Sequence, residues 1–157
     1  MKKVLVDAAG HFADRLAAQD QATPGYAAKF RKLSRRMRKA GGGDQTVPHV
    51  RPDQLIDVLL ARGTLLRPVA VVMKRGQPSN CHVNAATLFR AGKGLLATGY
   101  CLDTDGLWRQ HSWIVDLKGR VIETTERRVA YWGIVFDANG SELLAGVILR
   151  PLVDKAC

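Results

Sequence analysis

Cysteines, aromatic residues and long apolar runs are all scarce in this sequence. Its three cysteines are an odd number, no two of them form a CxxC pair, and aromatic residues make up 6% of the chain. This usage argues against a disulfide framework and predicts a reducing compartment. No apolar run is long enough to span a bilayer, and Asp7 interrupts the short N-terminal run early. We therefore expect neither a signal peptide nor a transmembrane segment, and a cytoplasmic location.

Acidic residues are also few. The 157 residues include 14 Asp and Glu against 24 Lys and Arg, which gives a formal net charge of +10 at pH 7. The composition is otherwise that of a globular protein, and the length suits one domain. Such an excess of positive charge keeps a small domain soluble, or it serves an acidic partner such as nucleic acid, an anionic membrane or an acidic protein.

The basic charge is concentrated between residues 29 and 39, within a helix that we expect over residues 26–40. Phe30, Leu33 and Met37 form the apolar face of this helix. The opposite face has seven basic residues and no acid: Lys29, Arg31, Lys32, Arg35, Arg36, Arg38 and Lys39. It would suit a phosphate backbone or another anionic surface, or it is simply solvated. Without interleaved aromatic residues or a recognition motif, nucleic-acid binding there would be non-specific.

A glycine-rich connector divides the chain. Apolar spacing predicts a first helix from Val4 to about Asp20, ended by a Thr-Pro-Gly break at residues 23–25. After the basic helix, the glycines at residues 41–43 open a flexible connector. We therefore expect a basic helical N-terminal segment, residues 1–43, appended to a domain over residues 44–157.

The domain after residue 43 combines helical and strand patterns. A helix is expected from Arg51 to Gly63, with Pro52 in its first turn, and a largely buried strand over residues 68–73. A second helix is expected from Cys81 to Gly92. Strand patterns follow at residues 95–102, 107–117, 120–125, 131–136 and 143–153, the last two around an Asn-Gly turn at residues 139–140. The predicted fold class is α+β, with a helix packed on an antiparallel sheet.

Cys81 is expected in the first turn of its helix. Ser79 or Asn80 is a suitable N-cap, and the unpaired N–H groups and positive dipole of a helix start favour the thiolate. The flanking residues are polar, unlike those around a cysteine that packs as a small apolar group. The Cys81 amide, with the side-chain amide of Gln77 or Asn80, could hold an oxyanion on a substrate carbonyl. Asn84 shares the Cys81 face of the helix.

His111 lies in the strand expected over residues 107–117, and two acids compete to orient it. Because side chains alternate along a strand, Asp116 points to the face opposite His111. A three-residue hairpin loop at residues 117–119, with glycine in the left-handed conformation, makes Glu123 the diagonal neighbour of His111, within reach of the imidazole. A two-residue loop would leave Glu126 on that face instead.

Other candidate side chains carry weaker signals. His82 follows Cys81 on the helix and faces away from it, which makes it a poor base. The cysteines and histidines of this region do not match a zinc-ligand spacing, so no metal or other cofactor is implied. Trp113 shares the face of His111 and is expected at the cleft wall, where it could contact a substrate.

The order of these residues resembles that of a known enzyme superfamily. A cysteine at a helix start, then a strand, HSW and VIETT is similar to the transglutaminase-like branch of the papain-like thiol enzymes. The segments CHVNA, HSW, VIETT and YWGIVF also resemble small uncharacterised proteins of phages and plasmids. The resemblance covers residues 76–136. It implies a papain-like core with Cys81 as nucleophile, His111 as general base and Glu123 as orienting acid, where most members have aspartate.

Residues and resemblance together predict a cysteine-dependent acyl-transfer enzyme. It would act on an amide or ester of a protein, a peptide or a small molecule through a thioester on Cys81, as a peptidase, amidase, transglutaminase or deamidase does. The alternative is a non-catalytic basic module that binds nucleic acid or an acidic protein through residues 29–39. Reaction of Cys81 with iodoacetamide well below pH 8 would distinguish the two.

Overall fold

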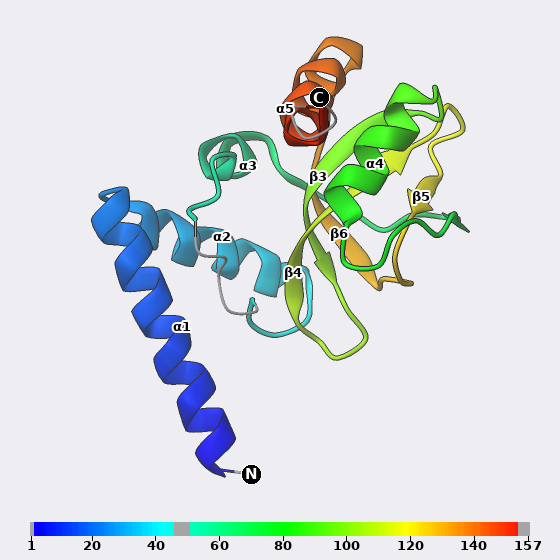
Figure 1. The fold of residues 1–157 in the computed structure, drawn as a ribbon. Coiled ribbons are helices and arrows are strands. Elements are labelled where there is room, and N and C mark those ends of the chain that lie inside the picture. The colour runs from blue at the N-terminus through cyan, green and yellow to red at the C-terminus, as the bar shows by residue number, and fades with distance from the viewer. Residues whose placement is uncertain (1, 46–50, 154–157) are drawn as a thin grey trace.

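The computed structural model describes the backbone of residues 2–45 and 51–153, and the side chains of residues 11–45 and 51–150 (Figure 1). Within these residues the chain forms five helices and a six-stranded, curled sheet, which is a mixed α+β architecture. None of the helices in the described part of the chain is both long enough and apolar enough to cross a bilayer.

Three helices precede the sheet. They are α1 (Lys2–Ala22), α2 (Tyr26–Ala40) and α3 (Ile56–Arg62). The bounds of α2 are those that the apolar spacing predicts, and Gly63 follows the last residue of α3 as expected. The predicted start of α3 at Arg51 is wrong, because the Asp53 side chain accepts a hydrogen bond from the Leu55 amide, at 2.9 Å, and holds residues 53–55 in a turn.

The sheet order follows from six strands of unequal length. These are β1 (Thr64–Leu66), β2 (Val71–Met73), β3 (Leu95–Leu102), β4 (Trp108–Val115), β5 (Val121–Glu123) and β6 (Ala130–Val135), arranged β1-β6-β3-β4-β5-β2. β1 was not predicted, and the pairing of β2 with β5 is parallel, whereas the other four pairings are antiparallel. Only residues 67–70 separate β1 from β2, although these strands form opposite edges. Because four residues span little distance, the sheet must curl to bring its edges together.

Two further helices cover one face of the sheet. α4 (Cys81–Arg90) and α5 (Ala138–Val153) pack on Leu96, Ile114 and Ile122 and on each other (Figure 1). The predicted strand at residues 143–153 and the turn at residues 139–140 are wrong, because both segments lie within α5. The buried positions of this segment recur with helical spacing, at Leu144, Ala145, Ile148 and Leu149. Asp137 caps the helix by accepting a hydrogen bond from the Gly140 amide at 2.7 Å.

The apolar face of α2 packs against the sheet. Phe30, Leu33 and Met37 lie in one core cluster with Tyr100 and Trp108 of the sheet. Both sides of the boundary expected at residue 43 therefore contribute to the same core. The Trp108 indole also donates a hydrogen bond to the Gly41 carbonyl at 3.0 Å, which ties the end of α2 to β4.

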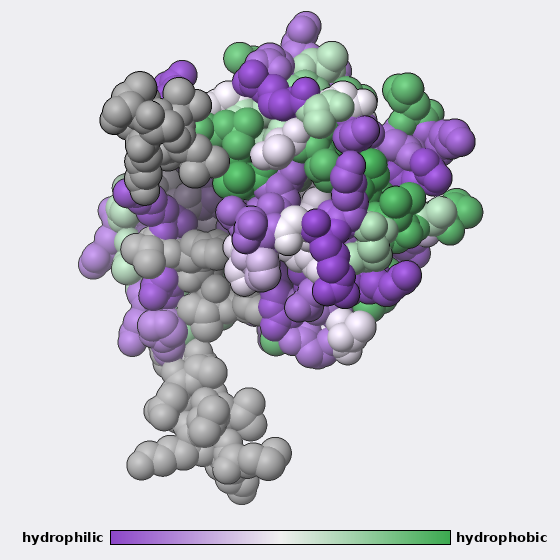
Figure 2. Space-filling view, turned by 45° about the vertical axis from the view of Figure 1, so that its right-hand side comes forward, coloured by the Kyte–Doolittle hydropathy of each residue, from purple (hydrophilic) through white to green (hydrophobic). Residues whose placement is uncertain are grey.

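The surface carries both polar and hydrophobic side chains. On the face shown in Figure 2, hydrophobic residues are intermixed with hydrophilic ones rather than gathered into one apolar area. The most exposed large hydrophobic side chains of the described residues include Leu143 and Val147, one turn apart on α5. The basic side chains of α2 lie on the opposite side of that helix from its buried face.

Candidate active site

The helix that begins at Cys81 is held by its own side chains. The Asn84 side chain accepts a hydrogen bond from the Gln77 amide at 3.1 Å and donates one to the Gln77 carbonyl at 2.8 Å. Ser79 has a φ of 56°, a conformation that non-glycine residues adopt mainly where the surrounding structure imposes it. Asn80 precedes the helix without a side-chain capping bond. The Cys81 thiol is thereby presented, partly exposed, at the first turn of α4.

The turn between β4 and β5 has the geometry on which the assignment of Glu123 depended. Gly119 has a φ of 72°, and its amide donates to the Asp116 carbonyl at 2.9 Å. Asp116 and Arg120 close a three-residue loop, and the next pair in the ladder is Val115 with Val121. In this register Glu123 lies diagonally across from His111.

The imidazole and the carboxylate are in contact. His111 Nε2 donates to Glu123 Oε2 at 2.8 Å, and the two side chains are 2% and 0% exposed. The Asp116 carboxylate instead accepts hydrogen bonds from Lys118 and Arg120 in its own turn. Glu126 lines the neighbouring cavity and makes no hydrogen bond to His111 among those found in the described residues.

Glu123 is a buried carboxylate with every lone pair in use. Its Oε1 accepts from the Thr124 amide at 2.8 Å and from the Thr125 amide at 3.0 Å, and Tyr131 donates its hydroxyl to Oε2 at 2.9 Å. Burial raises the pKa of Glu123, but the hydrogen bond and positive charge of His111, with these other donors, outweigh burial. The pKa of the carboxyl therefore lies below its ordinary value, and Glu123 is ionised.

Cys81 and His111 form the pair that the sequence predicts. They are hydrogen-bonded to each other, and since Nε2 of the ring is engaged by Glu123, Nδ1 is left for the thiol. Burial raises the pKa of Cys81, but the hydrogen bond and charge of His111 bring it below its ordinary value. Burial lowers the pKa of His111, yet its bonds to Cys81 and Glu123 raise it to about 9. Both shifts favour a thiolate–imidazolium ion pair at neutral pH.

A second hydrogen-bonded link joins α4 to β4 beside this pair. His82 Nδ1 lies 2.6 Å from Ser112 Oγ, which is 2.9 Å from Thr98 Oγ1, and Thr98 donates to the His111 carbonyl at 3.3 Å. The Ser112 amide hydrogen-bonds to the Cys81 sulfur. It can do so because β5 pairs with β4 only at Ile114 and Val115, which leaves the β4 edge open at Ser112. His82, which follows Cys81 in the chain, is thus hydrogen-bonded to Ser112, which follows His111.

Aromatic packing fixes the imidazole from behind. The Trp113 ring stacks on His111 with an interplanar angle of 16° and a centroid distance of 6.3 Å, and Trp113 also packs on Tyr131. Gly133 makes room for this packing, since a Cβ there would clash with the Thr98 carbonyl oxygen of β3 and lie 2.9 Å from the Trp113 ring. Trp113 is 1% exposed, so it supports the histidine from inside the core.

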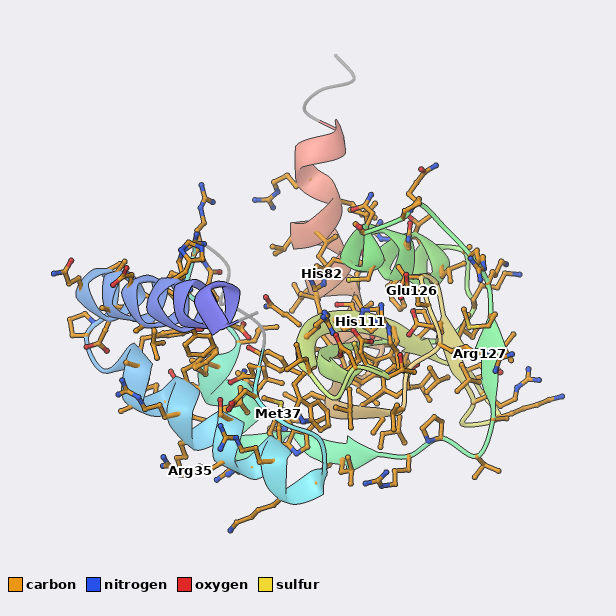
Figure 3. All side chains as sticks on the ribbon, turned by 90° about the horizontal axis from the view of Figure 1, so that it is seen from below. Arg35, Met37, His82, His111, Glu126 and Arg127 are labelled. Atoms are coloured by element: carbon orange, nitrogen blue, oxygen red, sulfur yellow. The ribbon has the colours of Figure 1, made fainter. Side chains whose placement is uncertain are left out.

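The reactive pair opens into a polar cavity of about 500 Å³. Cys81, His82 and His111 line it together with side chains of the β3–β4 and β5–β6 connections. Figure 3 shows His82, His111 and Glu126 in one region of the molecule, with Arg35 apart from them on α2. Cys101 also lines the cavity but is fully buried, and burial raises the pKa of its thiol well above the ordinary value. Only Cys81 of these two cysteines has the environment of a nucleophile.

The other predicted site residues do not all lie at the cavity. Gln77 and Asn80 are exposed and do not line the cavity, while the Asn84 amide is engaged with the Gln77 backbone. His82, expected to face away from Cys81, lies in the same cavity. The sequence patterns did not indicate the roles of Ser112 and Gln110 or the hydrogen bond from Tyr131 to Glu123, because the pattern of a strand carries no signal of which side chains touch across the sheet. No group of three or more potential metal ligands occurs among the described residues.

The basic residues of α2 are only partly neutralised by the protein. Lys29 pairs with Asp57, Arg38 with Asp44, and Arg36 donates to the Leu60 carbonyl. For four others no hydrogen bond or ion pair is found within the described residues: Arg31, Lys32, Arg35 and Lys39. They lie on the exposed side of the helix, remote in sequence from the cavity.

Comparisons with protein-family models, with curated proteins and with solved structures find no match to this chain.

Proposed function

We propose that this protein is a cysteine-dependent acyl-transfer enzyme built on a papain-like, transglutaminase-like core. The observation that carries the proposal is the hydrogen-bonded series Cys81, His111 and Glu123, opening into a cavity. The series has the parts that thiol catalysis requires: a nucleophile of lowered pKa, a base bonded to it, and a buried carboxylate that holds the base.

The chemistry follows from the positions of the protons. The Cys81 thiolate attacks the carbonyl carbon of an amide or ester, and the carbonyl oxygen takes the electron pair of the broken π bond. When the tetrahedral intermediate collapses, the His111 imidazolium gives its proton to the departing amine or alcohol, and a thioester remains on Cys81. His111, now neutral, takes a proton from water or an amine as that group attacks the thioester. The acid or amide leaves, and the ion pair is restored.

Glu123 and Trp113 act on this cycle through His111. The carboxylate accepts a hydrogen bond from Nε2–H throughout, which fixes the tautomer whenever the ring is neutral and stabilises the imidazolium when it forms. The Trp113 ring limits rotation of the imidazole. The amide groups of the first turn of α4 are the available donors for the oxyanion.

A generic ester tests the proposal without knowledge of the natural substrate. With p-nitrophenyl acetate we expect a burst of nitrophenolate and an acetyl group on Cys81, located by mass spectrometry of peptides. Cys101 is an internal control in the same molecule, because its buried thiol should stay unmodified. Acetylation that is absent from Cys81, or equal on both cysteines, would exclude the proposed chemistry.

We also propose a second, separate function: binding of a polyanion through α2. Arg31, Lys32, Arg35 and Lys39 favour it, since they are cationic and have no partner within the described residues. When such cations neutralise the phosphates of a nucleic acid, the counterions condensed on the nucleic acid are released, which favours binding; the carboxylates of an acidic protein are attracted by the same charge. Gel-shift titrations with random DNA duplexes at several salt concentrations test it. Binding that is absent, or unchanged by salt, would rule out this role.

A further inference from the structure

Among the residues whose side chains the structure describes, those that line the cavity beside Cys81 include no aliphatic side chain and no aromatic ring other than imidazole. Apart from the thiols of Cys81 and Cys101, each side chain that lines it carries a hydroxyl, an amide, an imidazole or a charge. Sites for small molecules are usually lined mainly by apolar residues that contact the apolar parts of the ligand. The composition of this cavity therefore indicates which kind of ligand it accepts.

Some of these polar groups are satisfied by the protein. Arg109 binds Asp105 with two hydrogen bonds, at 2.9 and 2.7 Å, and also pairs with Asp103. Arg128 pairs with Asp103 and donates to Thr125 Oγ1 at 2.9 Å. These contacts form a fixed, electrically neutral part of the wall, and their side chains are oriented before any ligand arrives.

Other polar groups of the cavity have no protein partner in the described part of the chain, and two of them, Glu126 and Arg127, are exposed to solvent. No hydrogen bond or ion pair is found for the side chains of Gln110, Glu126 and Arg127 within the described residues. The Nε of Arg128 is likewise buried without an acceptor there, on a side chain that is 10% exposed. Water can serve such groups in the free protein. A ligand that displaces this water must replace its hydrogen bonds, or each group loses them on binding.

We propose, building on the acyl-transfer function above, that the acyl group accepted by this cavity is hydrophilic. It is a hydrogen-bonding peptide-like segment that contacts Gln110, Glu126 and Arg127, and not an aliphatic or aromatic acyl chain. An apolar group of the same size would displace water from an amide, a carboxylate and a guanidinium without replacing the hydrogen bonds of that water. Sites that present polar groups to a ligand discriminate strongly against analogues that lack the matching polar atoms.

Two isosteric electrophiles test this inference. The chloromethyl ketones of N-acetyl-asparagine and N-acetyl-leucine have the same reactive carbon and nearly the same shape, differ in polarity, and carry the side chain on the acyl side of the carbonyl. In each, the Cys81 thiolate displaces chloride and forms a carbon–sulfur bond. We expect Cys81 of the full chain to react at least about tenfold faster with the asparagine compound, after correction for the rates of both with glutathione. A leucine compound that reacts as fast or faster would overturn the inference.

Substitutions in the cavity wall test whether the wall causes the preference for the asparagine compound. Replacing Gln110→Leu and Arg127→Leu together should reduce the ratio of the two rates at least fivefold, since the wall then offers an apolar group a match. Arg62→Leu, an exposed arginine of α3 outside the cavity, is the matched control and should keep the ratio. Far-ultraviolet circular dichroism verifies that each variant is folded. A ratio that is unchanged in the double variant would overturn the role given to these residues.

Failure of this inference is distinguishable from failure of the proposed function. If Cys81 reacts with iodoacetamide no faster than Cys101 does, the nucleophile is not activated, and the function and the inference fall together. If Cys81 reacts rapidly with iodoacetamide but does not prefer the asparagine compound, the function stands and the hydrophilic acyl group alone is excluded.

Discussion

Two regions of this protein have charged side chains in opposite circumstances. Around His111 they are buried and matched: Glu123 has a proton donor at each of its oxygens, and the imidazole lies between the carboxylate and the Cys81 thiol. On the outer side of α2 they are exposed, of one sign, and for four residues unmatched within the described part of the chain. The two sets of charges therefore differ in burial and in whether the protein supplies their partners.

The two environments have different physical consequences. Buried pairs are little affected by salt, and they move the pKa of their members, as His111 and Glu123 illustrate. Exposed charges are screened over about 8–10 Å at physiological ionic strength, and they act on partners rather than on the fold. The reaction at Cys81 should therefore respond to pH and to single substitutions, and polyanion binding should respond to salt.

The largest effect is expected at the nucleophile. Cys81→Ala should lower the burst of nitrophenolate by at least about a thousandfold, because no other thiol of the cavity is ionised near neutral pH. Stopped-flow absorbance measures the burst. Cys81→Ser should be nearly as inactive, since a hydroxyl is far less acidic than a thiol. Retention of the burst in either variant would contradict the assignment.

Glu123→Gln should have the largest effect on stability. It removes a fully buried charge and leaves the imidazolium without its counter-ion, at a cost of about 3–5 kcal/mol in the free energy of unfolding. The folded pKa of Glu123 is depressed, so its contribution is complete above about pH 4.5 and is lost as the pH falls through the folded value. Urea unfolding at pH 7 and at pH 3 measures both. Equal losses at the two pH values would contradict this account.

His111→Gln should change the pH profile of Cys81. Burial raises the thiol pKa and His111 lowers it, so removing the imidazole should move the midpoint of iodoacetamide labelling from below to above the ordinary thiol value of 9.0. Labelling at pH 7 should therefore be at least about tenfold slower, because a smaller fraction of the thiol is ionised. In the unmodified protein the ion pair should persist up to about pH 9, where His111 loses its proton. A labelling midpoint that is the same in both proteins would contradict the proposed ion pair of Cys81 and His111.

Ser112→Ala tests the link between α4 and β4. The substitution removes the hydroxyl that joins His82 to Thr98 but keeps the amide that contacts the Cys81 sulfur. We expect labelling of Cys81 at pH 7 to slow about three- to tenfold and the free energy of unfolding to fall by about 1 kcal/mol. Ser112→Thr, which restores a hydroxyl, should recover part of the rate. No recovery would indicate that the hydroxyl only fills space.

Charge reversal on α2 should have the smallest effect on the reaction. Arg31→Glu with Arg35→Glu should leave the rate of Cys81 labelling within about twofold, because exposed charges at a distance are screened. The same variant should lose binding to duplex DNA. The affinity of the unmodified protein should fall steeply as salt rises, by about one factor of ten in affinity per tenfold salt for each phosphate neutralised. Labelling that falls together with DNA binding would break the proposed separation of the two regions.

Much of the site was accessible from local patterns. Alternation along β4 set Asp116 apart from His111, and the Leu-Lys-Gly loop defined the register that brings Glu123 to the ring. A polar, loop-like lead into an apolar helical pattern indicated that α4 begins at Cys81. In α5 the same reasoning failed, since Asn-Gly is a common hairpin turn, whereas the apolar residues that follow it recur with helical spacing.

Other features exist only in the folded protein. The sequence by itself determined which residues share a strand face, where α4 begins and how strongly α2 is charged, because backbone geometry and side-chain chemistry are local properties. The tertiary structure decided that α2 shares a core with the sheet, that His82 bonds to Ser112, and that the walls around Cys81 are polar. These features depend on contacts between segments far apart in the chain, and they are selected by the packing of the whole domain rather than by any one segment.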